Sequence, residues 1–132
     1  MVKRILAALT GALICGHVVA APNWIFYSKA PAQDWYVDAN SIKSAGTNGY
    51  SLWMKYVMTG SDPKVAPGVS QVVIHAYGKC GAASLILDSI AAFDAAGNVV
   101  ATQDTEQKVG MPPGSIYEGI ASTACKVTQA SK

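Results

Sequence analysis

The sequence predicts an exported α+β domain, in which an antiparallel β-sheet of about six strands carries a C-terminal α-helix packed on one face and tied to it by a disulfide. Three observations support this. A leader with signal-peptide features precedes residues 21–132, short alternating runs separated by turn residues fill much of the chain, and a helix-start motif precedes the last cysteine. Residues 21–132 are expected to form a single domain.

The leader, residues 1–20, has the three parts of a signal peptide. Lys3 and Arg4 supply the positive charge, an apolar stretch follows, and small residues end at Ala20. We favour cleavage after Ala20, because a cut one residue later would leave Pro22 directly beyond it. The apolar stretch is about 15 residues long, whereas a membrane-spanning helix needs roughly 20. It therefore predicts export, with no transmembrane segment in the mature chain.

Cys15 raises the alternative of a lipoprotein, since bacterial lipidation uses a cysteine at the cut that follows small residues. Ile14, directly before it, is too bulky for that signal. We expect Cys15 to be discarded with the leader. The predicted location is the periplasm or the cell surface at the outer membrane.

The charge of the mature chain is balanced. Without Lys3 and Arg4, the 10 basic residues of the chain fall to eight, equal to its 8 acidic residues, and all eight are lysines. Lysine lacks the planar fork with which arginine reads phosphates and base edges. This composition excludes nucleic acid as the expected partner.

The mature chain keeps two cysteines, Cys80 and Cys125. Two cysteines in an exported chain usually form a disulfide. A bridge that closes about 45 residues contributes roughly 4 kcal/mol to stability in the loop-entropy description. We therefore predict a Cys80–Cys125 bridge that matters greatly to so small a domain.

Short strands are predicted in consecutive order, which favours an antiparallel meander. The clearest run, residues 50–59, alternates at period two and places Tyr50, Leu52 and Met54 on a core face. The others are residues 24–28, 35–38, 71–80, 84–93 and 98–103, the last two joined by a turn through Gly97.

The alternation in residues 71–80 distinguishes the two faces of the sheet. Cys80 shares a face with Val72 and Ile74, so a helix bonded to Cys80 must cover that face. His75, Tyr77 and Lys79 project from the opposite side, here called the open face. Trp53 and Lys55 of the neighbouring strand are expected there too.

Asp88 interrupts an apolar run, Leu85 to Ile90. Its expected place is the solvated face of a half-buried strand. A catalytic carboxylate would need a nearby partner, and the sequence identifies none.

The C-terminal helix is predicted from a capping box in which Ser115 caps the helix and Glu118 reaches back. Three residues, Ile116, Ile120 and Ala124, form an apolar stripe. Small residues beside it, Gly119, Ala121 and Ser122, are expected to allow close approach to the sheet. Cys125 would then point from the last turn towards the sheet.

Taken together, these landmarks resemble the surface-adhesin protein E family of exported bacterial domains. The resemblance rests on residues 35–42, the aromatic strand 52–56, Cys80 at a strand end, the hairpin 93–100 with Gly97, and residues 113–115 before the helix that carries Cys125.

The resemblance implies a helix disulfide-tied across the concave side of the sheet and frequent pairing into a homodimer. It also implies a protein partner, namely adhesion to host extracellular-matrix or serum proteins. The alternatives are a soluble periplasmic structural or envelope accessory protein without a host-directed role, and an inhibitor of an exported enzyme.

No catalytic residue, cofactor site or metal site is predicted. The mature chain has one histidine, His75, and its cysteines are better used in a bridge than in a thiol or zinc site. The candidate protein-binding residues are those of the open face, Trp53, Lys55, His75 and Tyr77. The other interpretation is that these side chains only pack against loops or a second subunit.

Overall fold

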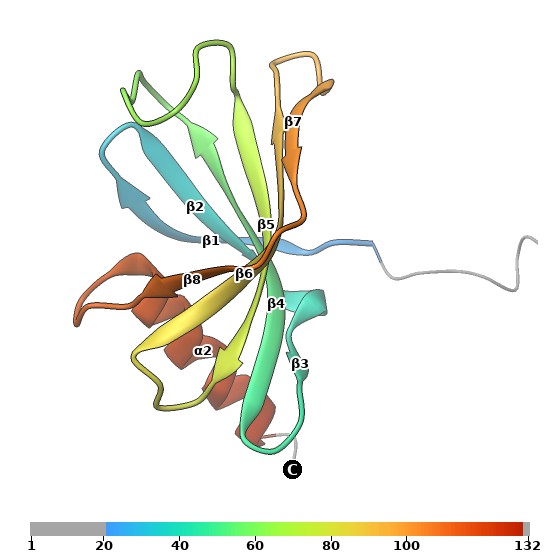
Figure 1. Ribbon diagram of the computed structural model, residues 1–132, viewed down its shortest axis with the longest axis vertical. Coiled ribbons are helices and arrows are strands. Elements are labelled where there is room, and N and C mark those ends of the chain that lie inside the picture. The colour runs from blue at the N-terminus through green and yellow to red at the C-terminus, as the bar shows by residue number, and fades with distance from the viewer. Residues whose placement is uncertain (1–20, 131–132) are drawn as a thin grey trace, which may run out of the picture.

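The computed structural model describes residues 21–130, so the predicted signal peptide and Cys15 lie outside the described residues. It contains one sheet, a short 3-10 helix and one α-helix (Figure 1). The elements in chain order are β1 (Trp24–Ala30), β2 (Gln33–Asp38), η1 (Ala39–Ser41), β3 (Lys43–Ser44), β4 (Gly49–Met58), β5 (Gln71–Lys79), β6 (Ser84–Phe93), β7 (Val99–Gln103), β8 (Gln107–Gly110) and α2 (Ile116–Ala130).

The 8-stranded sheet has the order β1-β2-β4-β5-β6-β7, with β3 added to β4 and β8 added to β6. Every pairing is antiparallel, which confirms the predicted meander. The sheet twists strongly, and α2 lies behind the half that contains β8 and the lower part of β4 and β5 (Figure 1).

Two strands and the 3-10 helix were not predicted. β3 has only two residues, Lys43 and Ser44, and both are exposed, so no alternation marks it. β8 is short and polar, and it forms because its backbone completes the ladder beside residues 84–87 of β6. Neither strand carries a hydrophobic pattern that a sequence could reveal.

The core lies between the sheet and α2, on the face predicted from alternation. Tyr50, Leu52 and Met54 of β4 are fully buried, and Ile120 of α2 is buried among them. Tyr50 lies opposite Gly78 in the ladder. A Cβ on Gly78 would lie 2.8 Å from the Tyr50 hydroxyl, so the glycine makes room for the ring.

A β-bulge in β6 explains the position of Asp88. Across from it, His75 pairs with Ser89 and Ala76 pairs with Leu87, so Asp88 is the extra residue between them. The extra residue lets both Leu87 and Ile90 face the core although they are three positions apart. It also leaves the Asp88 side chain on the open face.

The helix begins as predicted, with one difference in the cap. The Ser115 hydroxyl accepts a hydrogen bond from the Glu118 backbone N–H at 3.2 Å. The Glu118 carboxylate accepts from the N–H of Gly114 at 2.9 Å, one residue earlier than a standard capping box. Gly119 gives the expected close approach of α2 to the sheet, because a Cβ there would overlap the hydroxyl of Tyr27 in β1. Ser122 does not contribute to this approach, because it is exposed.

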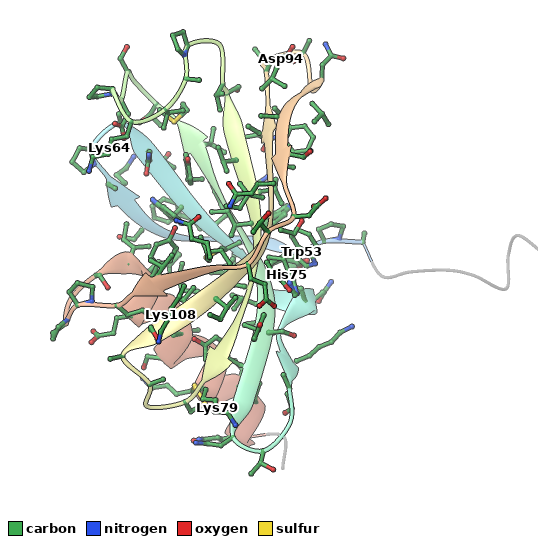
Figure 2. All side chains as sticks on the ribbon, in the orientation of Figure 1. Trp53, Lys64, His75, Lys79, Asp94 and Lys108 are labelled. Atoms are coloured by element: carbon green, nitrogen blue, oxygen red, sulfur yellow. A yellow bond between two sulfur atoms is a disulfide. The ribbon has the colours of Figure 1, made fainter. Side chains whose placement is uncertain are left out.

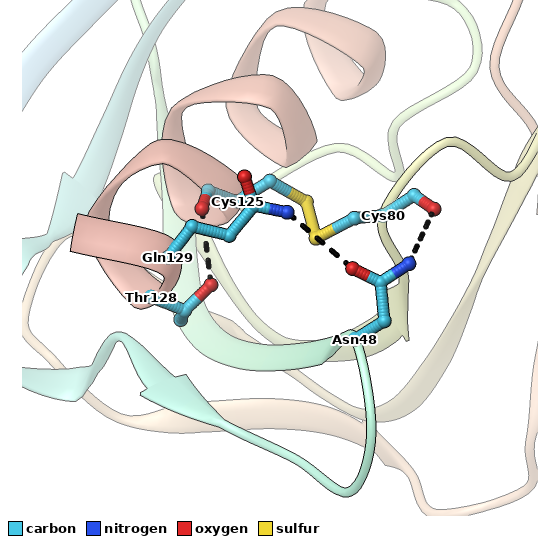
Figure 3. Close-up of a disulfide and its surroundings, with 5 residues drawn as sticks. All are labelled: Asn48, Cys80, Cys125, Thr128 and Gln129. Atoms are coloured by element: carbon cyan, nitrogen blue, oxygen red, sulfur yellow. Dashed lines mark hydrogen bonds between the residues drawn. A yellow bond between two sulfur atoms is a disulfide. The ribbon is translucent and has the colours of Figure 1, made fainter. Parts of the chain in front are cut away.

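The predicted Cys80–Cys125 disulfide is present, with Cα atoms 5.7 Å apart (Figure 3). Polar contacts surround it. Asn48 donates to the Cys80 carbonyl at 3.3 Å and accepts from the Gln129 amide at 3.4 Å. The bridge therefore fixes the last turns of α2 to the end of β5 and to the turn before β4.

Candidate binding surface

The open face brings Trp53 and His75 into contact. They are direct partners on neighbouring strands β4 and β5, and their ring centroids are 4.8 Å apart. Figure 2 shows the two side chains next to one another where the N-terminal segment passes the sheet. Trp53 keeps 36% of its surface exposed, so an apolar ring remains available to a partner.

Lys55 lies two residues further along β4 and is held between aromatic rings. Its Nζ atom is 4.5 Å from the centroid of the Trp24 ring and 5.6 Å from that of Tyr36. Partial burial lowers the pKa of Lys55, while the electron-rich ring faces favour the charged ammonium and oppose that effect. Among the described residues, no carboxylate lies within ion-pair distance of this ammonium.

His75 has a second partner, Asp88. Its Nδ1 atom is 2.6 Å from the Asp88 carboxylate, and both side chains are about one-quarter to one-third exposed. The bulge in β6 supplies this carboxylate. The pair fixes the imidazole against Trp53, so the Trp53 ring rests on an oriented neighbour.

Tyr77 projects from the same face but makes a different contact. Its hydroxyl donates to the Glu106 carboxylate at 2.6 Å. This hydrogen bond, with smaller effects of burial and of the charges of Glu106 and Asp88, raises the pKa of Tyr77. Tyr77 thereby joins β5 to the connection between β7 and β8.

The aromatic surface is larger than the sequence predicted. Phe26, on the edge strand β1, is 50% exposed and packs edge-on against Tyr36 at 5.8 Å. Phe26, Tyr36 and Lys55 follow one another across three strands. We use the name open-face cluster for six of these residues: Trp24, Phe26, Tyr36, Trp53, Lys55 and His75.

Three members of the open-face cluster, Trp24, Phe26 and Tyr36, were missed in the sequence. Alternation in residues 35–38 places Tyr36 opposite to the core residues Trp35 and Val37, so the signal was present for that residue. Trp24 and Phe26 alternate with the core-packed Tyr27, but the bulge between Phe26 and Ser28 reverses the alternation in the rest of β1, where Ala30 packs on the core.

A groove of about 740 Å³ borders this cluster. Its walls come from the segment before β1, the start of β1, the end of β2, η1, β3 and the middle of β4 and β5. The lining residues are Pro22, Trp24, Asp38, Asn40, Ser41, Lys43, Ser51, Trp53, Val73 and His75.

Within residues 21–130, no group of three or more His, Cys, Asp or Glu side chains is arranged to hold a metal ion. No helix in that same range is long and apolar enough to cross a membrane.

Comparison with known proteins gives one family. The sequence profile of surface-adhesin protein E matches residues 24–126, which extend from the first residue of β1 to beyond the second bridge cysteine. No curated protein matches the chain. The family match covers well over half of the chain and includes the open-face cluster and the disulfide, so this chain belongs to the surface-adhesin protein E family.

Proposed function

We propose that the chain is exported, loses residues 1–20, and acts as a non-enzymatic binding domain that captures a protein partner through the open-face cluster. Membership in a surface-adhesin family supports an adhesin-like role, an exported location and binding in place of catalysis. The residues that carry the binding, the partner and the compartment are our proposal.

The observation that carries the proposal is the exposure of large apolar rings on the side of the sheet opposite α2. Trp53 and Phe26 are both exposed there, although neither is needed by the core. Tryptophan contributes more binding energy at protein interfaces than most residues, particularly when a rigid neighbour supports it. Trp53 has such a neighbour in His75.

Charge narrows the kind of partner. The mature chain has equal numbers of lysines and acidic residues, so long-range steering by net charge is weak. Recognition would depend on short-range aromatic contacts with Lys55 as a local cation. A folded host matrix or serum protein that presents an apolar patch with a carboxylate fits this surface.

The direct test is Trp53→Ala in the protein purified after export, assayed on immobilised fibronectin, laminin and vitronectin. We expect a folded variant whose capture falls at least tenfold, because removal of a central interface tryptophan costs about 2 kcal/mol or more. Val100→Ala is the matched control, since Val100 is also exposed but lies on β7. Equal capture by the wild type, Trp53→Ala and Val100→Ala would contradict the proposal.

A homodimer through the same face is tested with the same variants. Light scattering of the wild type would then give twice the monomer mass, and Trp53→Ala would shift the mass towards the monomer. If Trp53 has no effect on mass but lowers capture, the face serves a different partner.

Location separates adhesion from the accessory role in the periplasm. Protein on intact cells that external protease removes supports adhesion, whereas release with the periplasmic fraction supports the accessory protein. The intact mass of the exported form tests the cut, which we place between Ala20 and Ala21.

A further inference from the structure

We infer that the groove beside Trp24 and Trp53 binds a neutral carbohydrate. This deepens the proposed function and rests on it, because Trp53 and His75 belong both to the groove and to the open-face cluster. The ligand would be a glycan, carried by a partner protein or free. At about 740 Å³, the groove has the size usual for small-ligand sites.

A carboxylate in the groove wall offers a free acceptor to a ligand. Asp38 is 7% exposed and lines the groove. Its Oδ1 atom accepts from the backbone N–H groups of Asn23 at 2.8 Å and Asn40 at 3.0 Å. Its Oδ2 atom accepts from none of residues 21–130, and no lysine or histidine there pairs with it. Among the described residues, Tyr50 alone has a buried side-chain polar atom without a partner, so the free Asp38 oxygen is reached by solvent, and a ligand hydroxyl that replaces this water could donate to it.

The other polar groups of the groove both donate and accept. The Asn40 amide uses its N–H on the Ala21 carbonyl, at 2.9 Å, and keeps its oxygen available within the described chain. Ser51 adds a hydroxyl and Lys43 an ammonium. A hydroxylated ligand satisfies this mixture, because each hydroxyl can donate to an oxygen and accept from a nitrogen.

The charges disfavour ionic ligands of either sign. Lys43 and the amino group that cleavage would leave on Ala21, next to the lining residue Pro22, would repel an amine cation, and Asp38 would repel a phosphate or carboxylate. A neutral ligand meets neither repulsion.

Two indole rings supply the apolar part of the site. The C–H groups on one face of a pyranose carry slight positive charge and pack on the electron-rich face of an aromatic ring. Trp24 and Trp53 both line the groove, and each is supported by a fixed neighbour, Lys55 for Trp24 and His75 for Trp53. Aromatic platforms beside hydroxyl partners are what a sugar ring requires.

The test is NMR titration of the protein purified after export with lactose, maltose, cellobiose and N,N′-diacetylchitobiose. The chain has three tryptophans and therefore three indole N–H signals. We expect at least one sugar, at concentrations near the roughly 1 mM dissociation constant of weak ligands, to shift the signals of Trp24 and Trp53. The Trp35 signal is the internal control, because that indole is buried and donates to Gln33 at 3.1 Å.

Asp38→Asn tests the carboxylate without removing the turn. The asparagine oxygen can still accept from the two backbone N–H groups, while an NH₂ replaces the groove-facing acceptor. We expect at least a tenfold loss of sugar affinity and an unchanged Trp35 signal. Asp34→Asn is the matched control, since Asp34 lies on the same strand but pairs with Lys29 at 3.1 Å. Equal affinity in Asp38→Asn would overturn the assignment.

Charged probes distinguish the neutral ligand from the ionic ones. Choline and 3′-sialyllactose are titrated in parallel. If either shifts Trp24 and Trp53 while no neutral sugar does, or if no probe shifts them, the inference is overturned. Neither result affects the capture assay with Trp53→Ala, so failure of the carbohydrate site and failure of the proposed protein capture are separable.

Discussion

The ammonium group of Lys55 lies 4.5 Å from the centre of the Trp24 ring, although β1 and β4 are separated in the sheet by β2. The long lysine side chain crosses β2 over Tyr36, its direct partner in the ladder. One lysine thus connects three strands on the open face. It does so without a carboxylate partner among the described residues.

The Lys55–Trp24 contact predicts an energetic coupling. A double-mutant cycle of Lys55→Met and Trp24→Leu should give a coupling energy of about 0.5–1 kcal/mol, the usual range for a partly exposed cation–π contact. Urea unfolding of the four proteins measures it. The same cycle with Lys64, in the loop between β4 and β5 (Figure 2), should give a value near zero. Equal couplings in the two cycles would contradict the contact.

The disulfide should supply much of the stability. Its cysteines are separated by 45 residues, for which the loop-entropy description gives roughly 4 kcal/mol. We expect the double variant Cys80→Ser, Cys125→Ser to lose about 2–4 kcal/mol in urea unfolding. The non-reduced wild type should be about two daltons lighter than the reduced form, by loss of two hydrogens. Two free thiols by titration would rule the bridge out.

Gly119→Ala should destabilise the protein although alanine favours helices. The new methyl group would overlap the Tyr27 hydroxyl, and such overpacking costs about 1–3 kcal/mol, against about 1 kcal/mol gained in helix propensity. Adding Tyr27→Phe removes the overlapping hydroxyl and should recover part of the loss. The recovery is incomplete because the ring carbon Cζ stays 2.9 Å from the new Cβ. Ser122→Ala, on the exposed side of α2, should lose nothing. Thermal unfolding distinguishes these outcomes.

Tyr117 should make the fold sensitive to alkali. Burial, and to a smaller extent Tyr56, raises the pKa of Tyr117 to about 12 from its ordinary value of 10.0. Below pH 10 the tyrosine is protonated in both folded and unfolded chains, so it adds no pH dependence. Between pH 10 and 12 the unfolded chain releases the proton first, and stability falls as the pH rises.

The variant Tyr117→Phe isolates that effect. Between neutral pH and about pH 11, the wild type should lose about 1 kcal/mol more stability than the variant. The reason is that pH 11 lies about one unit above the pKa of tyrosine in the unfolded chain, so the unfolded wild type gains that free energy by losing its proton. Tyr50, whose pKa burial also raises, contributes equally to both proteins, so the difference reports Tyr117 together with its interaction with Tyr56. Urea unfolding at the two pH values measures the difference. Parallel losses in the two proteins would contradict a buried, neutral Tyr117.

Local pattern was sufficient for the features that depend on neighbours in the chain. Ser115 and Glu118 are three residues apart, so the helix start could be predicted, and the same holds for the period-two alternation of β4 and the turn at Gly97. The disulfide followed from counting cysteines. The side of the sheet that carries Trp53 followed from the parity of Cys80 in β5.

Contacts between distant segments could not be predicted in this way. The sequence identified no partner for Asp88, because the bulge that brings this residue to His75 depends on how β6 pairs with β5. Trp24 reaches Lys55 because of strand order, which alternation does not specify. The groove needs residues from four segments of the chain.

Whether a side chain faces the core or faces outward could be predicted from the sequence, since that depends on the period of the backbone and is local. Which outward residues meet could not, because the register and order of the strands set the distances between them. Thus Trp53 could be assigned to a face from its position alone. Its neighbours, His75 held by Asp88 and the groove lined by Asp38 and Trp24, required the assembled sheet.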